Sequence, residues 1–344
     1  MSPETTGPRI AVVITTIGRP RLLDRLLLSL AGQTRPPDEV VVVDQGDEPG
    51  TAAVVERRSD RLAIRRITSP RGASAGRNAG LAALGLLPAP AGHRPTTAAP
   101  SDGPLQTSSG SGPASTALLS PPAEIVAFPD DDTWYPPDAL ARAARALADG
   151  PDVVSGRLLA SDGDRAQWRF ADEPRPIDAR TVWSHARIET CFFQAPVLRT
   201  TGGFDEDLGV GCGTPWQSGA ETELLLRALK RGRTLTYDPD IRVYEHDPDE
   251  PHASDPVHRA KARHTARGAG HVYRRHYGAA TCAKIVARPL GAAVLSLARG
   301  RIPDARRHLH KAIGRVEGMT GILFRAPGPV APQPRGSAQG GGSA

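Results

Sequence analysis

The sequence is poor in aromatic and sulfur-containing residues. Only 4% of its 344 residues are Phe, Trp or Tyr, and it contains three cysteines and two methionines. Cys191, Cys212 and Cys282 are odd in number and far apart, and no C-x-x-C pair occurs. They therefore predict neither a disulfide framework nor a zinc site, and a reducing compartment fits them best.

Long uninterrupted apolar runs are also missing. No run reaches the roughly 18 residues that a membrane span needs, and residues 1–8 lack a basic-then-apolar signal pattern. Glycine (36) and proline (33) are frequent but show no Gly-X-Y period, which excludes collagen. We therefore expect a cytoplasmic protein, either soluble or held peripherally on the cytoplasmic face of a membrane.

The overall balance of residues indicates a folded, basic protein. Hydrophobic residues make up 39% and charged residues 23%, which excludes wholesale disorder. Lys and Arg number 43 against 37 Asp and Glu, for a net charge of +6 and a pI near 9.6. This charge suits a phosphorylated ligand, an acidic membrane surface or nucleic acid. Because stacking aromatics are scarce and no recognition motif occurs, we do not expect nucleic acid to bind.

Short β-branched runs alternate with helical patterns, which predicts a layered α/β domain. Expected strands are Ile10–Thr16, Glu39–Asp44, Leu62–Thr68, Glu124–Phe128, Asp152–Leu158, Glu189–Gln194 and Thr234–Tyr237. The first expected helix begins at Pro20 and ends before Gly32. Further helices are expected at Thr51–Arg58, Ala73–Leu87, Pro136–Asp149 and Ala220–Arg231. The first two strands show no polar alternation, so we expect both of their faces to be buried.

Composition divides the chain into five parts. We expect residues 9–250 to form the α/β domain and residues 88–122, rich in Pro, Ala, Ser, Thr and Gly, to form a disordered insertion within it. We expect a basic helical region over residues 251–325 and flexible ends over residues 1–8 and 326–344.

Three consecutive carboxylates follow one of the apolar strands, in the run FPDDDTWYPPDAL. Ligands of open α/β sheets bind at the carboxyl ends of strands, and an all-oxygen set such as Asp130, Asp131 and Asp132 suits Mg²⁺ or Mn²⁺. A metal there could hold a diphosphate. The competing interpretation is a solvated Asp-rich turn that caps the next helix.

Five segments in order resemble family 2 glycosyltransferases with the GT-A fold, which is a Rossmann-like layered α/β fold with a mixed central sheet. They are IAVVITTIGRP, EVVVVDQGD, SPRGASAGRNAGLAAL, FPDDDTWYPPDAL and GGFDEDLGVGCGTPWQSGAETELLLRALKRG, between about Arg9 and His246. The resemblance implies inverting transfer of a sugar from a nucleotide-diphosphate sugar, with a divalent metal at the D-x-D motif. The implied acceptor is a hydroxyl of a glycan or of a lipid-linked saccharide.

The resemblance also implies a set of donor-binding residues. Thr15, Thr16, Arg19 and Asp44 would hold the nucleoside, although Gln45 stands where relatives often have a second aspartate. Arg77 would lie near the base and the phosphates, and its competing interpretation is a surface arginine on a helix. Asp130 and Asp132 would be the metal ligands, with Asp132 the direct one, and Asp131 would face the sugar or ribose. His246 resembles a histidine that binds metal or phosphates in some relatives, or it is a structural histidine.

On the acceptor side, the resemblance makes Glu221 the general base that deprotonates the hydroxyl. Ala220 precedes it where relatives commonly have an acidic residue, and Glu223 is the weaker alternative beside the acceptor. Ser218 and Glu221 also have the spacing of a capping box, which is the structural alternative. Trp216 is expected to stack on a sugar face or to be a packing aromatic.

Three further alternatives stay open on the sequence. The basic helices of residues 251–325 could lie on an anionic membrane or pack back on the α/β domain. The enzyme could be a nucleotidyltransferase of similar fold, which would release pyrophosphate. The chain could also be a non-catalytic module that binds sugar nucleotides or nucleic acid.

Overall fold

The computed structural model describes residues 7–46, 48–88, 122–161, 170–246 and 255–324. Apart from residues 7, 8, 88 and 122, the expected flexible N-terminus, insertion and tail lie outside these ranges.

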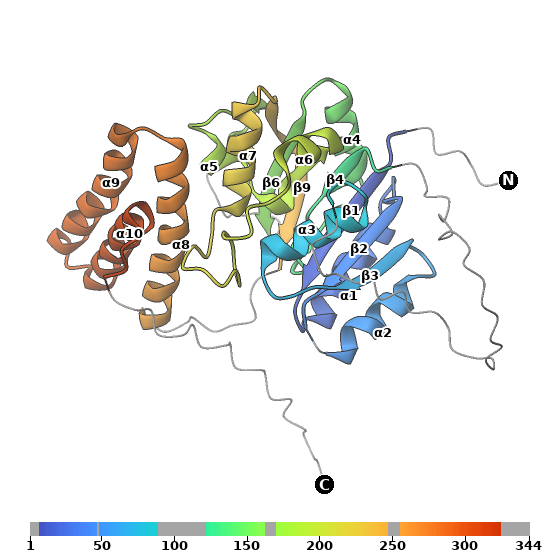
Figure 1. The fold of residues 1–344 in the computed structure, drawn as a ribbon, viewed down its shortest axis with the longest axis horizontal. Helices are drawn as coiled ribbons and strands as arrows, with labels where there is room; N and C mark the ends of the chain where they lie inside the picture. Colours follow the sequence, from blue (N-terminus) through green and yellow to red (C-terminus); the bar gives the residue numbers. More distant parts are fainter. Residues whose placement is uncertain (1–6, 47, 89–121, 162–169, 247–254, 325–344) are drawn as a thin grey trace, which may run out of the picture.

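The described chain alternates strands and helices in its first two thirds and is helical afterwards (Figure 1). The strands are β1 (Ile10–Thr16), β2 (Glu39–Asp44), β3 (Ile64–Thr68), β4 (Ile125–Ala127), β5 (Thr133–Trp134), β6 (Val153–Ala160), β7 (Arg175–Pro176), β8 (Cys191–Gln194) and β9 (Leu235–Glu245). The first helices are α1 (Pro20–Ala31), α2 (Pro49–Arg58), α3 (Ala73–Ala83), α4 (Ala139–Ala148), α5 (Val182–His185), α6 (Ala195–Thr201) and α7 (Ala220–Lys230), with a 3₁₀ turn η1 (Ile188–Thr190). The C-terminal helices are α8 (Asp255–His276), α9 (Ala279–Ala298) and α10 (Ile302–Thr320).

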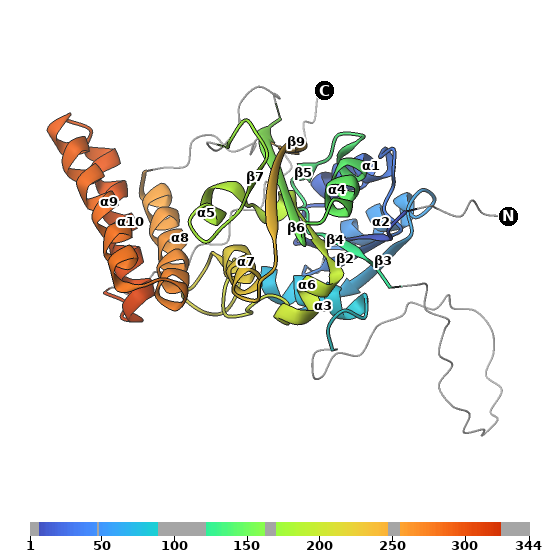
Figure 2. The ribbon, with the colours of Figure 1, turned by 90° about the horizontal axis from the view of Figure 1, so that it is seen from above.

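In the described part of the chain, nine strands form one mixed sheet. The order is β3-β2-β1-β4-β8-β6-β9-β5, with β7 paired to β9. Strands β1 to β4 pair in parallel, whereas β8 runs antiparallel to both β4 and β6. Figure 2 shows α1, α2 and α4 on one side of the sheet and α3, α6 and α7 on the other. The predicted layered α/β domain is therefore confirmed.

Strand β2 shows why the continuous β-branched runs are central strands. Val40 and Val42 belong to the core beneath α1 and α4, while Val41 and Val43 belong to the core on the other face. Because neighbouring side chains of a strand point to opposite faces, a strand covered on both sides must be apolar throughout. The expectation that this strand is buried on both faces is confirmed.

Several predicted boundaries are wrong. Helix α3 ends at Ala83 rather than Leu87, Glu189 lies in η1 rather than in a strand, and β9 extends to Glu245 rather than Tyr237. The short elements α5, α6, β5 and β7 were not expected from the sequence. Helix α9 runs through Pro289 without ending.

The C-terminal helices form a layer beside α7. Figures 1 and 2 place α9 and α10 on the side of α8 that faces away from the sheet. A buried carboxylate, Glu317 of α10, accepts hydrogen bonds from Arg263 and Arg267 of α8. Gly270 allows close approach of the two helices, since a Cβ atom there would lie 2.3 Å from the carbonyl oxygen of Arg315. Helix α8 is therefore fixed to α10, and α9 lies outside.

Helix α9 corrects the expectation that no segment is long and apolar enough to span a membrane. Its 20 residues have a mean hydropathy of 1.3 over an 18-residue window, and only 22% of that window is buried. Among the described residues it is the one helix that meets the length and composition of a span. The sequence count missed it because Arg288 and Pro289 interrupt the apolar run without ending the helix.

Candidate functional site

The acidic triplet follows β4 at the carboxyl edge of the parallel strands. Phe128 is fully buried before it, with its ring 5.1 Å from that of Phe204. The backbone of Asp130 forms a parallel bridge with Thr15 at the end of β1. The triplet therefore lies where β1 and β4 end side by side, which is the usual ligand edge of such a sheet.

Asp131 points into the protein. Thr16 donates a hydrogen bond from Oγ1 to Asp131 Oδ2 at 2.7 Å, and Arg19 Nη1 lies 3.1 Å from Oδ1. Burial raises the pKa of Asp131 to about 6, against the opposing effects of Arg19 and Thr16. The expectation that Asp131 faces the sugar or ribose is thus not met by this geometry, because the side chain is buried against β1.

Asp130 and Asp132 are more open, with 43% and 28% of their side chains exposed. Arg77 donates to Asp130 at 2.8 Å, and Arg19 donates to Asp132 at 3.1 Å. Burial and the charge of Asp130 raise the pKa of Asp132, while Arg19 opposes them. The interpretation of the triplet as a solvated helix cap is wrong, since α4 begins only at Ala139, behind Asp138.

The two open carboxylates fit a hard divalent cation, since Mg²⁺ and Mn²⁺ favour carboxylate oxygens and Mg²⁺ is commonly held by one or two of them together with substrate phosphates. In the residues that the structure describes, three or more His, Cys, Asp or Glu side chains do not gather into a metal site.

Arg77 reaches the triplet because α3 crosses close to β1. A Cβ atom on Gly80 would lie 2.3 Å from Val13 Cγ1, so only glycine permits this approach. The Arg77 guanidinium is buried and lies 5.5 Å from the centre of the Phe204 ring. The interpretation of Arg77 as an ordinary surface arginine is therefore wrong.

The end of β2 is also occupied by polar contacts. Asp44 is buried and accepts hydrogen bonds from Arg66 at 3.1 and 2.9 Å and from the Gly46 amide at 3.1 Å. Gln45 donates to Ser69 Oγ and to the carbonyl oxygen of Gly72, both at 3.0 Å. Gln45 thus fixes the loop that leads into α3 and carries Arg77 toward the triplet.

Glu221 lies in the first turn of α7, where Gly219 is the N-terminal cap residue and no side-chain cap bond forms. Ser218, the other member of the expected capping box, instead donates to the carbonyl oxygen of Thr265 in α8 at 2.7 Å. The capping-box alternative is therefore wrong. The half-buried Glu221 lies at the N-terminal end of α7, where the helix dipole is positive.

Two residues that carry no sequence motif, Arg187 and Glu189, form an ion pair at the 3₁₀ turn η1. The Glu189 carboxylate is buried and accepts a hydrogen bond from Arg187 Nε at 3.1 Å. Burial raises the pKa of Glu189 to about 7 despite Arg187, and the charges of Asp130 and Glu221 add to the rise. Burial alone would lower the pKa of Arg187. The negative charges of Glu189 and Glu221 outweigh this effect, so the pKa of Arg187 is raised. The Arg187–Glu189 pair therefore links the two carboxylates electrostatically.

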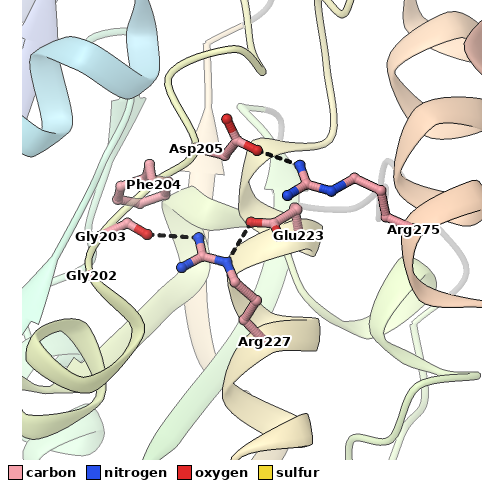
Figure 3. A pocket seen from close by; sticks show the side chains of 7 residues that line it. All are labelled: Gly202, Gly203, Phe204, Asp205, Glu223, Arg227 and Arg275. Carbon is pink, nitrogen blue, oxygen red and sulfur yellow. Dashed lines mark hydrogen bonds and ion pairs between the residues drawn. The ribbon is translucent and has the colours of Figure 1, made fainter. Parts of the chain in front are cut away.

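Glu223 is not available to an acceptor. Only 1% of its side chain is exposed, and Arg227 donates to it at 2.7 Å (Figure 3). His276 Nε2 lies 3.2 Å from its carboxylate. Burial raises the pKa of Glu223, but the bonds from His276 and Arg227 outweigh it and lower the pKa overall. The prediction that Glu223 binds the acceptor is wrong, because the residue joins α7 to α8.

Figure 3 shows the small pocket beside this joint, with Arg275 of α8 directed at Asp205 and Arg227 directed at Glu223 and the Gly203 carbonyl. Phe204 also lines the pocket, and the Arg77 guanidinium lies over its ring. Asp205, which pairs with Arg275 of the C-terminal layer, therefore directly follows Phe204, on which Arg77 packs.

The remaining predicted residues lie close to these groups. The His246 amide donates to the carbonyl oxygen of Asp132 at 2.8 Å, which places His246 beside the triplet. Trp216 stacks on His271 of α8, with ring centres 4.7 Å apart, so it has the packing role that was the alternative interpretation. The ligand-binding roles of both residues stay predictions.

Comparison with known proteins identifies a family and a fold. The model of "Glycosyl transferase family 2" matches residues 11–84 and 121–212. Validoxylamine A glucosyltransferase from Streptomyces hygroscopicus subsp. limoneus is 47% identical over 62 residues, which are 17% of this chain and 14% of that protein. This relative therefore supports the family over a short segment only.

Solved structures resemble the chain over most of its length. TarS 1–349 of S. aureus in complex with UDP-GlcNAc has 16% identity and a TM-score of 0.51, covering 92% of this chain and 93% of that one. The mannosyltransferase PcManGT from Pyrobaculum calidifontis, in complex with GDP-Man and Mn²⁺, has 18% identity and a TM-score of 0.54, covering 91% and 88%. The expected GT-A fold is confirmed.

Proposed function

This chain belongs to glycosyl transferase family 2, and from that premise we propose that it transfers a sugar from a nucleotide-diphosphate sugar to a hydroxyl of a glycan or lipid-linked saccharide. The observation that carries the proposal is the presence of two open carboxylates, Asp130 and Asp132, beyond the end of β4 at the ligand edge of the sheet. A third carboxylate, Glu221, lies in the first turn of α7. The charges of Asp130 and Glu221 both act on the buried Glu189.

The donor occupies the edge formed by β1, β2 and β4. Thr15, Thr16 and Asp44 at the ends of β1 and β2 form the nucleoside side, and Arg19 and Arg77 approach the diphosphate. Both arginines now pair with the acidic triplet, and their planar donors suit phosphate oxygens equally well. Donor binding would therefore exchange one set of charge-assisted hydrogen bonds for another.

Asp130 and Asp132 would hold a divalent cation, and His246 lies beside them. Charge neutralisation on the departing diphosphate is the chemistry that bound Mn²⁺ or Mg²⁺ would supply. PcManGT was solved with GDP-Man and Mn²⁺, which supports this assignment for the similar edge in this chain.

Glu221 acts as the general base. The acceptor hydroxyl gives its proton to the Glu221 carboxylate while its oxygen forms a bond to the anomeric carbon. The bond from that carbon to the diphosphate oxygen breaks, and its electron pair leaves with the nucleoside diphosphate. Attack from the side opposite the leaving group inverts the anomeric configuration.

We place the acceptor beside the loop that precedes α7, where Trp216 lies, and we place the protein at the cytoplasmic face of a membrane. The second placement rests on the basic C-terminal helices and would give a lipid-linked saccharide direct access to Glu221. Nucleic acid is not part of the proposal.

A panel of nucleotide sugars, incubated with Mn²⁺ and with saccharide acceptors, tests the proposed reaction. We expect release of a nucleoside diphosphate together with a glycosylated product. Release of pyrophosphate from a nucleoside triphosphate would instead establish a nucleotidyltransferase. Donor binding without turnover on any acceptor would leave only a binding module, and so would contradict the proposal.

A further inference from the structure

The outer face of α9 carries apolar side chains that other described residues leave uncovered. Leu290, Val294 and Leu297 are spaced by four and three residues, so they share one side of the helix. Val294 is 68% exposed and Leu297 is 57% exposed. Exposed apolar residues are ordinary when they are single, but a contiguous stripe indicates a contact surface.

The face of α9 that lies beside this stripe, about a quarter turn around the helix, packs against the rest of the layer. Cys282, Ile285, Pro289 and Ala293 are buried, and Arg315 of α10 donates a hydrogen bond to the carbonyl oxygen of Ile285. The helix is therefore held to the rest of the layer by one side, and its apolar stripe faces outward. A role for α9 as an ordinary core helix does not fit this arrangement.

The segment that carries the stripe is rich in positive charge. Residues 279–311 contain seven Lys and Arg residues and a single acidic residue, Asp304. Asp304 is already paired with Arg301 and Arg307. The exposed basic residues of this segment are Lys284, Arg288, Arg299, Arg301, Arg306 and Arg307.

We propose that the outer face of α9, together with the turn into α10, docks on an anionic phospholipid surface. An amphipathic helix of this kind lies in the interface, with aliphatic side chains among the acyl chains and arginines at the headgroups. The occupant is a lipid surface rather than a second copy of the chain, because an identical copy would bring the same uncompensated positive charge against this face. The proposal does not depend on the sugar-transfer reaction.

Vesicle binding of the full-length chain tests the proposal. We expect sedimentation with vesicles that contain phosphatidylglycerol, little with phosphatidylcholine alone, and weakening as salt is added, since surface attraction is screened. The double variant Val294→Asp with Leu297→Asp should weaken binding at least about tenfold, and so should Arg299→Glu with Arg301→Glu. These positions are exposed, and circular dichroism would verify that the variants fold.

Helix α1 offers matched control positions on another face. Leu28 is an exposed leucine, and Arg21 and Arg25 are exposed arginines of the same helix. We expect Leu28→Asp, and Arg21→Glu with Arg25→Glu, to leave vesicle binding unchanged. Equal losses in both helices would mean that net charge alone drives binding, which would overturn the proposal.

A local probe distinguishes docking from the other occupants. The three native cysteines are buried, so Val294→Cys can be labelled selectively with a polarity-sensitive fluorophore. We expect a blue shift on phosphatidylglycerol vesicles and none from the same label at Leu28→Cys. A shift that depends only on protein concentration would establish a second copy instead, and resistance to alkaline extraction would establish a membrane span. Either result would contradict surface docking.

Discussion

The sheet of the α/β domain and the outer helix of the C-terminal layer place their apolar side chains in opposite ways. Strands β1 and β2 bury valine and isoleucine on both faces, whereas α9 exposes leucine and valine. In these two strands, the polar groups lie at the ends, where the triplet and Asp44 gather. In α9, the apolar groups themselves form the outer surface. One region is therefore built to hold a polar ligand at an edge, and the other to meet an apolar phase.

The two regions meet at α7, where two acidic residues have separate tasks. The charge of Glu221 acts, with that of Asp130, on the buried Glu189, and Glu223 joins α7 to α8 through Arg227 and His276. Variants at these two positions test this difference, since a change at Glu221 should affect the chemistry and a change at Glu223 should affect the stability.

The largest expected effect is on the rate of sugar transfer by the Glu221→Gln variant. Loss of a general base should lower sugar transfer by about 10²–10⁴-fold, while donor binding and the free energy of unfolding stay unchanged. Transfer kinetics and urea unfolding measure the two quantities. Glu56→Gln, at an exposed position of α2, is the control. Wild-type transfer by Glu221→Gln would place the base elsewhere.

Glu223→Gln should have the converse effect. Removing one member of a buried ion pair leaves Arg227 uncompensated, and we expect a loss of about 3–5 kcal/mol in the free energy of unfolding. Transfer measured well below the unfolding transition should persist. The double variant with Arg227→Met should be no less stable than Glu223→Gln alone. If the free energy of unfolding of Glu223→Gln were unchanged, Glu223 would not stabilise the contact between α7 and α8.

Glu189 should give the unfolding free energy a particular pH dependence. Its pKa is raised from 4.5 to about 7 by burial, so between these values the folded state binds more protons than the unfolded state. Its contribution to stability is therefore complete below pH 4.5 and declines as the pH rises toward neutrality. Glu189→Gln cannot titrate, so relative to wild type it should gain on the order of 1–3 kcal/mol across this range. Urea unfolding at several pH values measures the difference, and parallel pH profiles would contradict it.

The smallest expected effect is on the stability of α9 variants. Val294→Asp with Leu297→Asp should change the free energy of unfolding by less than about 0.5 kcal/mol, as surface substitutions usually do, and should leave transfer to a soluble acceptor intact. Leu27→Ala in α1, at a fully buried position, should cost about 2–5 kcal/mol. Comparable losses in the two variants would mean that the α9 face is buried.

The sequence predicted the elements whose apolar pattern is unbroken. β1, β2, α1 and α7 lie within a residue or two of their expected positions because their burial is continuous or strictly helical. β9 was cut short because Pro239 resembles a strand end. The strand continues past it, and its register with β6 shifts between Ser155 and Arg157.

The site residues were predictable only where the motif alone places them. The triplet and Glu221 follow from order along the chain, but the inward direction of Asp131 depends on Thr16 and Arg19. Ser218 resembles a helix cap in sequence, but its hydroxyl donates a hydrogen bond to the carbonyl oxygen of Thr265 in α8, 47 residues later. Arg187 and Glu189 carry no motif, since their importance comes from tertiary proximity to Asp130 and Glu221.

Calorimetric titration of a nucleotide-diphosphate sugar tests the central claim most directly, with Mn²⁺ and with a chelator, on wild type, Asp132→Asn and Glu221→Gln. We expect metal-dependent binding in wild type and Glu221→Gln, and loss of that binding in Asp132→Asn. Equal donor affinity in Asp132→Asn, or in the presence of chelator, would contradict it.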